Sequence, residues 1–126
     1  VAFCRDAQKS DRDLLLIEGV GGVMAPLDDR HTVLDWIDEL GAPALLVCGS
    51  YLGAISHALT AAAALAARGI TIAGVVVDES EASTVPLADT VATLKRFLPA
   101  RLPLATVERG AEGKAVLKAL RPMIMA

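Results

Sequence analysis

The sequence is poor in aromatic residues, in cysteine and in long uninterrupted hydrophobic runs. Aromatic residues make up 3% of the 126 residues although hydrophobic residues make up 54%, so the apolar material is mostly small and aliphatic. Such side chains suit the tight packing of helices on strands in one α/β domain of ordinary size, residues 1–126. The two cysteines, Cys4 and Cys48, have no metal-binding spacing, and we interpret them as reduced thiols of a cytoplasmic protein.

The sequence also lacks the features of a membrane-spanning protein and of a nucleic-acid-binding protein. No apolar run approaches the ~20 residues that a bilayer-spanning helix needs, and no signal peptide is recognisable. The formal net charge is -3 and basic residues do not cluster, which argues against nucleic acid as a partner. The first residue is valine, so we expect the chain to be the carboxyl-terminal part of a longer protein.

The most informative stretch is residues 13–26, DLLLIEGVGGVMAP. Its apolar run, residues 14–17, predicts a buried parallel strand. Glu18 follows directly, at the strand end where open α/β sheets place their ligands. Gly19, Gly21 and Gly22 then form a loop whose backbone N–H groups could approach an anion. A solvated glutamate and a turn without a ligand remain the plainer alternatives.

Apolar periodicity and capping residues predict an alternation of helices and strands along the rest of the chain. We expect a parallel sheet with helices on both faces. The predicted helices are residues 1–9, 33–40, 54–68, 86–97 and 111–120, and the predicted strands are 14–17, 44–48, 70–77 and 102–107.

Several strings in this order resemble the carboxyl-terminal half of the dethiobiotin synthetase family, over roughly residues 11–104. They are IEGVGGVMAPL, LLVCG, YLGAISHALTAAAAL and GITIAGVVV. The resemblance implies a P-loop NTPase-like, three-layer fold whose amino-terminal P-loop portion is missing, because no G-x4-GK-[ST] string occurs.

The resemblance implies an enzyme of biotin biosynthesis that uses ATP, Mg²⁺ and CO₂. Such enzymes close the cyclic urea of dethiobiotin on 7,8-diaminopelargonic acid, through a carbamate and a carbamic-phosphoric anhydride, and act as homodimers with the substrate site at the subunit interface. Since the P-loop is absent, we expect the 126-residue chain alone to be inactive. Two alternatives stay open: an amide synthase of the cobyrinic acid type, and a non-catalytic dimerising relative.

Residue roles follow from the same resemblance. Glu18 matches the family's Mg²⁺ ligand beside the nucleotide, and Gly19, Gly21 and Gly22 match the loop against the substrate. The start of the long helix matches the site for the substrate's carboxylate, where free N–H groups favour an anion; its residues are Gly53, Ala54, Ile55 and Ser56. Ser56 stands where the family usually has Asn, so its reach is shorter. No catalytic residue is assigned within this segment.

Two further positions match the family's nucleotide-base site, Asp78 and Val107. The family commonly has Asn at the position of Asp78. A carboxylate can accept a hydrogen bond from the adenine amino group but cannot donate one to a ring nitrogen. Other purine nucleotides therefore become possible, and the segment around Val107 lacks the family's proline.

The histidines have ordinary interpretations. We expect His57 to form a hydrogen bond near the helix start and not to act as a catalytic base, and we assign Tyr51 no role. Asp28, Asp29 and His31 are expected to be a solvated loop, since no further ligand stands at a metal-binding spacing.

Overall fold

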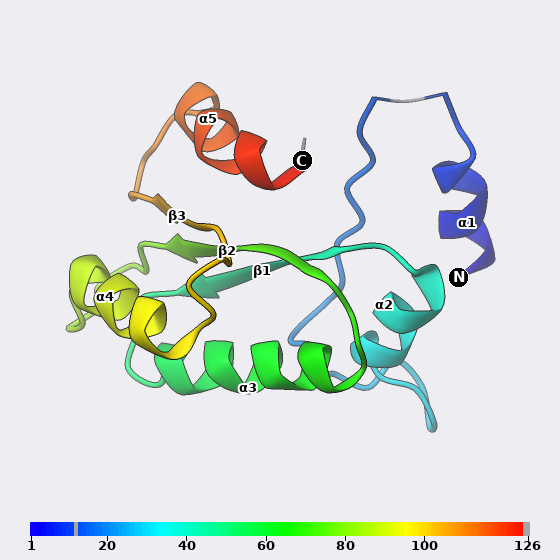
Figure 1. The fold of residues 1–126 in the computed structure, drawn as a ribbon, viewed down its shortest axis with the longest axis horizontal. Coiled ribbons are helices and arrows are strands. Elements are labelled where there is room, and N and C mark those ends of the chain that lie inside the picture. Colours follow the sequence, from blue (N-terminus) through cyan, green and yellow to red (C-terminus); the bar gives the residue numbers. More distant parts are fainter. Residues whose placement is uncertain (12, 125–126) are drawn as a thin grey trace.

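Three parallel strands form the sheet of this protein, in a computed structural model that describes residues 1–11 and 13–124. The strands are β1 (Ala44–Gly49), β2 (Ile72–Asp78) and β3 (Leu104–Val107), side by side in the order β1-β2-β3 (Figure 1). The central strand β2 is buried on both faces, with Val75 and Val77 fully inaccessible to solvent. Its unbroken apolar sequence has the composition expected for such a strand.

Helices cover both faces of this sheet. Helices α3 (Ala54–Ala67) and α4 (Leu87–Phe97) lie on one face, and α5 (Gly113–Ile124) lies on the other (Figure 1). Ala58 of α3, Val77 of β2 and Leu94 of α4 form a core cluster on the first face. The predicted fold class, a parallel sheet with helices on both faces, is confirmed.

Gly74 explains how closely α5 approaches β2. A Cβ atom at Gly74 would lie 2.5 Å from Sδ of Met123, near the end of α5. A larger residue would therefore force the methionine side chain aside. The glycine that interrupts the apolar strand sequence is thus a packing position rather than a strand breaker.

Two shorter helices precede the sheet, α1 (Ala2–Gln8) and α2 (Val33–Leu40). Thr32 caps α2: its hydroxyl oxygen accepts from the N–H of Asp35, while the Asp35 carboxylate accepts from the Thr32 N–H, which is a capping box. Gly41 ends the helix in the left-handed conformation, with φ of 63°. The helix predicted over residues 33–40 is confirmed.

The predicted strand over residues 14–17 is wrong for this structure. The segment has no regular secondary structure and pairs with no strand among the described residues, and Leu14 and Leu16 are 41% and 66% exposed. A strand forms only when a neighbour satisfies its N–H and C=O groups. Apolar composition made the segment suitable for a buried strand, but none of the described strands pairs with it.

Other differences are shifts of a few residues. Strand β3 begins two residues later than expected, and α5 extends to Ile124 and contains Pro122. The buried face of α3 consists of Ala54, Ala58, Ala62 and Leu65, and Ile55 and Leu59 beside it are partly exposed. In the described part of the chain, no helix has the length and hydrophobicity to cross a membrane.

Candidate functional site

The carboxyl ends of the three strands form one edge of the sheet, which we call the carboxyl edge. Asp78, the last residue of β2, is in register with Gly49 of β1 on one side and with Val107 of β3 on the other. The N–H of Glu79 donates to the Val107 carbonyl over 2.9 Å and continues this pairing past the strand ends. Two of the predicted nucleotide-binding residues, Asp78 and Val107, are therefore direct neighbours, and the third is Glu18 of the glycine loop.

The start of α3 lies just beyond the end of β1, at the same edge. Gly53 is the cap residue with φ of 94°, a left-handed conformation that favours glycine. Ala54 is buried and Ser56 is exposed. A helix start presents N–H groups and the positive end of the helix dipole. The predicted substrate-binding residues 53–56 thus share an edge with Asp78.

Tyr51 and His57 contact each other across the turn into α3. The Tyr51 hydroxyl lies 2.9 Å from Nδ1 of His57, and the Tyr51 carbonyl accepts from the N–H of Ala54. The prediction that His57 forms a hydrogen bond near the helix start is confirmed. Its partner is Tyr51, a residue to which we assigned no role from the sequence.

The glycine loop is anchored on α2. A Cβ atom at Gly19 would lie 3.1 Å from Val33 and 3.5 Å from the ring of Trp36, so only a small residue fits there. Gly21 has φ of 80°, and the N–H of Leu34 donates to the Val23 carbonyl over 2.7 Å. Among the described residues, no hydrogen bond joins residues 18–22 to the carboxyl edge.

Glu18 is exposed and forms no ion pair with any described residue. Its carboxylate is therefore available to a ligand. No group of three His, Cys, Asp or Glu side chains suited to a metal ion occurs within residues 1–11 and 13–124. Glu18 can supply one oxygen ligand, and the other ligands of a Mg²⁺ ion must come from phosphate and water or from other protein groups.

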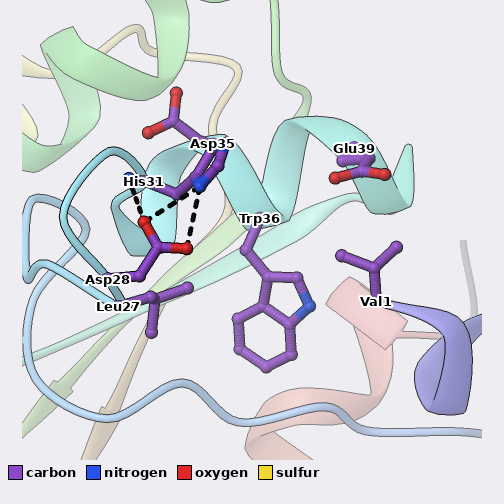
Figure 2. Close-up of a pocket in the computed structure, with 7 residues that line it drawn as sticks. All are labelled: Val1, Leu27, Asp28, His31, Asp35, Trp36 and Glu39. Atoms are coloured by element: carbon purple, nitrogen blue, oxygen red, sulfur yellow. Dashed lines mark hydrogen bonds and ion pairs between the residues drawn. The ribbon is translucent and has the colours of Figure 1, made fainter.

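A cavity that does not adjoin the carboxyl edge lies beside α2 (Figure 2). It has a volume of about 430 Å³ and contains none of the predicted site residues. Its lining residues are Val1, Leu27, Asp28, His31, Asp35, Trp36 and Glu39. The charged groups in it already have protein partners, so we assign it no ligand.

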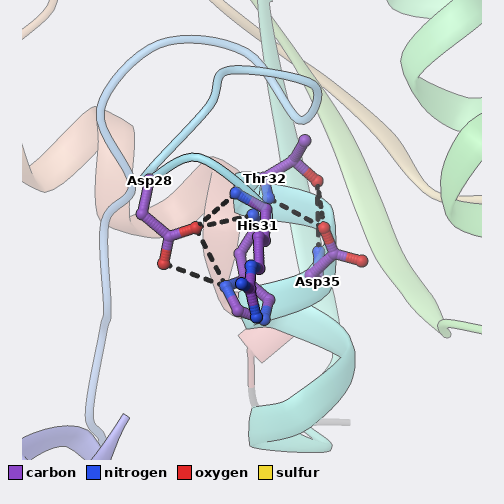
Figure 3. Close-up of polar contacts among 5 residues, drawn as sticks. Asp28, His31, Thr32 and Asp35 are labelled. Carbon is purple, nitrogen blue, oxygen red and sulfur yellow. Dashed lines mark hydrogen bonds and ion pairs between the residues drawn. The ribbon is translucent and has the colours of Figure 1, made fainter.

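Figure 3 shows the hydrogen bonds of two of these carboxylates, Asp28 and Asp35. One Asp28 oxygen accepts from the backbone N–H groups of Arg30 and His31, and His31 Nδ1 lies 2.9 Å from the other. This hydrogen bond raises the pKa of His31 and lowers the pKa of Asp28. Asp35 accepts from the Thr32 backbone, the Thr32 hydroxyl and Arg68, which hold the pKa of Asp35 well below its usual range.

The loop over Asp28, Asp29 and His31 was expected to be solvated, and these residues are exposed. The aspartate–histidine contact inside the loop was not expected. Its role is local, because one carboxylate satisfies the N–H groups of a tight turn.

A smaller cavity of about 180 Å³ lies beside Val107. It is enclosed by the end of β3, the loop that follows and the first part of α5; its lining residues are Thr106, Val107, Glu108, Ala111, Ala115 and Val116. Val107, which lines this cavity, pairs with Asp78 of β2.

Three serines at the carboxyl edge were missed by the sequence analysis. Ser50 is fully buried and exchanges hydrogen bonds with Ser80, and the Ser83 hydroxyl donates to the Ser50 carbonyl. The only signal in the sequence was a polar residue soon after each of two strands. Nothing local indicated that residues 30 positions apart would meet.

The sequence is similar to one protein family and to relatives that share one name. A family model described as an AAA domain matches residues 2–111. The chain is 50% identical over 103 residues to the ATP-dependent dethiobiotin synthetase BioD of Acidiphilium cryptum (strain JF-5), covering 82% of this chain and 46% of the relative. For the proteins of the same name from Caulobacter sp. (strain K31) and Methylobacterium nodulans (strain LMG 21967 / CNCM I-2342 / ORS 2060), identity is 58% and 41%. These matches cover 63% and 94% of this chain, and 34% and 55% of the relatives. The chain thus spans between a third and just over half of these relatives.

Proposed function

Because this chain belongs to the AAA domain family and is similar to ATP-dependent dethiobiotin synthetases over part of their length, we propose that it is the carboxyl-terminal part of such an enzyme. The resemblance expected from the sequence motifs is thereby confirmed. The proposed reaction closes the ureido ring of dethiobiotin from 7,8-diaminopelargonic acid and CO₂, with ATP as co-substrate.

One observation carries the proposal: the predicted base-binding and substrate-binding residues lie at one edge of the sheet. Asp78 and Val107 are register neighbours, and the start of α3 follows β1 at the same edge. Carboxyl edges of parallel sheets are the usual position of ligands in α/β proteins. The side chain of Asp78 is exposed and can meet the exocyclic amino group of a purine.

We assign the substrate's distant carboxylate to the start of α3. The N–H groups of Ile55 and Ser56 lie in the first turn of α3, where the helix dipole favours an anion, and the exposed Ser56 hydroxyl can add one hydrogen bond. We assign the backbone N–H groups of Gly19, Gly21 and Gly22 to the substrate at the glycine loop. Holding both ends of the substrate aligns its amines for carbamate formation and ring closure.

Glu18 is the residue of this chain that we assign to Mg²⁺. Its exposed and unpaired carboxylate fits a metal that takes one or two carboxylates together with phosphate oxygens and water. When bound, Mg²⁺ would offset charge on the phosphoryl group during its transfer. Glu18 would hold the ion, and the glycine loop behind it is kept in place by α2.

The complete enzyme is proposed to act in the cytoplasm as a homodimer. We assign the triphosphate cradle and any further Mg²⁺ ligand to a part of the complete enzyme outside residues 1–126, since these residues include no G-x4-GK-[ST] string.

The test is direct assay of dethiobiotin formation. The full-length gene product, supplied with diaminopelargonate, bicarbonate, Mg²⁺ and ATP or GTP, should release phosphate and dethiobiotin in equal amounts. The 126-residue chain alone should give none. Absence of turnover by the full-length protein with either nucleotide would refute the proposal, and turnover by the 126-residue chain would refute the assignment of the cradle.

A further inference from the structure

Two loops at the carboxyl edge are joined by a reciprocal pair of neutral hydrogen bonds. The N–H of Ser50 donates to Oγ of Ser80 over 3.0 Å, and the N–H of Ser80 donates to Oγ of Ser50 over 3.1 Å. We call this pair of contacts the serine bridge. Ser50 follows β1 and is fully buried, whereas Ser80 follows β2.

Neighbouring residues support the serine bridge. The Ser83 hydroxyl donates to the Ser50 carbonyl and accepts from the N–H of Val85, which connects the bridge to the start of α4. A Cβ atom at Gly49 would lie 2.4 Å from Oγ of Ser80, so the close approach of the two loops requires glycine there. In the described structure, every hydrogen bond between residues 50–53 and 79–85 involves these three serines.

The serine bridge connects the two halves of the proposed site. Ser50 lies three residues before Gly53, where the proposed carboxylate site begins, and Ser80 lies two residues after Asp78, the proposed base-reading residue. Neither serine needs to touch a reactant. A tie between the loops at this point determines how far the start of α3 lies from Asp78.

We propose that Ser50 and Ser80 are positioning residues that fix the distance between the base-binding and substrate-binding parts of the site. This inference rests on the proposed function. Ser80 lies two residues after Asp78, so a displaced loop after β2 would move the base-reading carboxylate and weaken nucleotide binding as well as the alignment of the reacting groups. The bridge supplies this alignment through backbone donors held at the ends of two rigid strands.

The test is Ser80→Ala in the full-length gene product, which removes the acceptor of the Ser50 N–H. One neutral hydrogen bond corresponds to about a 3- to 10-fold effect, so the nucleotide KM should rise by that factor. A merely structural role would lower the folded fraction, and hence the apparent kcat, with KM unchanged. Ser80→Thr retains the hydroxyl and should restore the KM to within about twofold of wild type.

Ser10→Ala is the matched control. Its hydroxyl donates to the Ala7 carbonyl at the exposed end of α1, far from the sheet in sequence. The same atom is removed as in Ser80→Ala, and kinetics should not change.

Hydrogen exchange tests the bridge without any catalysis. In Ser80→Ala the amides of residues 50–53 should exchange faster, while those of 75–77 in β2 keep their wild-type rates. Unchanged exchange at residues 50–53 would overturn the bridge itself, and faster exchange with an unchanged nucleotide KM would overturn the positioning role.

A wild-type protein without turnover would refute the proposed function but not the bridge. Calorimetric affinity for Mg²⁺–ATP and Mg²⁺–GTP would then replace KM. An equal affinity in wild type and Ser80→Ala would overturn the positioning role, and a 3- to 10-fold loss, about that of one hydrogen bond, would support it.

Discussion

At the scale of single residues, Asp78 offers the sharpest test of nucleotide choice. A carboxylate accepts hydrogen bonds and donates none, so it suits the two adjacent N–H donors of guanine better than the donor–acceptor edge of adenine. Asp78→Asn supplies both a donor and an acceptor. We expect it to shift the ratio of kcat/KM for ATP over GTP upward by about 10-fold, the value of one or two hydrogen bonds.

Steady-state assays of the full-length protein with both nucleotides would measure that ratio. Asp89→Asn is the control, because it makes the same change from carboxylate to amide outside the proposed site. Asp89 lies in the first turn of α4. A ratio that stays constant in Asp78→Asn would exclude Asp78 from reading the base.

His31 gives a pH dependence with a definite sign. Its contact with Asp28 raises the folded-state pKa above the ordinary value of 6.5, and Asp35 and Glu39 act in the same direction. Protonated His31 is therefore favoured by folding. The stabilisation is complete below about pH 6.5 and is lost as the pH rises through the folded-state pKa.

We expect the melting temperature to fall slightly over that interval, and His31→Gln to remove this part of the slope. The effect is small because both side chains are exposed. Thermal melts of both proteins from pH 5.5 to 8.5 would measure it. A slope in His31→Gln equal to that of wild type would contradict the assignment.

At the scale of secondary structure elements, α2 depends on its capping box. Thr32→Ala removes the side-chain oxygen that accepts from the Asp35 N–H and should lower the free energy of unfolding by about 1 kcal/mol. Thr32→Ser keeps the oxygen and should lose much less. Urea unfolding curves of wild type and the two variants would measure these free energies of unfolding. An equal loss of free energy in both variants would show that the threonine methyl group stabilises the helix instead.

The elements that sequence could predict are those defined by local signals. Thr32 and Gly41 bracket α2, and Gly69 with φ of 70° follows the end of α3. Residues 14–17 carried an equally clear apolar pattern, but a strand also needs a partner, which no local signal supplies. The serine bridge was not predictable for the same reason, since its two residues meet only through the pairing of β1 with β2.

The candidate site was predictable to a similar extent. Asp78 and Val107 were placed at strand ends by their sequence positions, and the register makes them neighbours. The relation of Glu18 to that edge could not be predicted from local pattern, because the glycine loop is fixed by α2 and not by the sheet.

At the scale of the whole molecule, β1 has a strand on only one side within the described residues. Val47 on β1 is 61% exposed, and Leu14 and Leu16 are exposed as well. An open strand edge with apolar side chains promotes pairing between chains. The 126-residue chain alone should therefore associate as its concentration rises.

Val47→Lys should weaken that association by placing a charge on the open strand. Sedimentation velocity at a series of concentrations would measure it, with Leu117→Lys as the control because that exposed apolar side chain lies on α5. A wild-type chain that stays monomeric throughout, or equal effects of both substitutions, would show that β1 is not the contact.

The loops along the carboxyl edge are joined by two kinds of contact that respond differently to the solvent. The serine bridge is neutral, whereas Arg109 pairs with Glu81 over 2.6 Å with both side chains mostly exposed. Dissolved ions screen the second contact and leave the first almost untouched. Concentrated salt should thus loosen the loop after β3 while the loops after β1 and β2 stay together. Ionic strength therefore distinguishes the ion pair from the serine bridge.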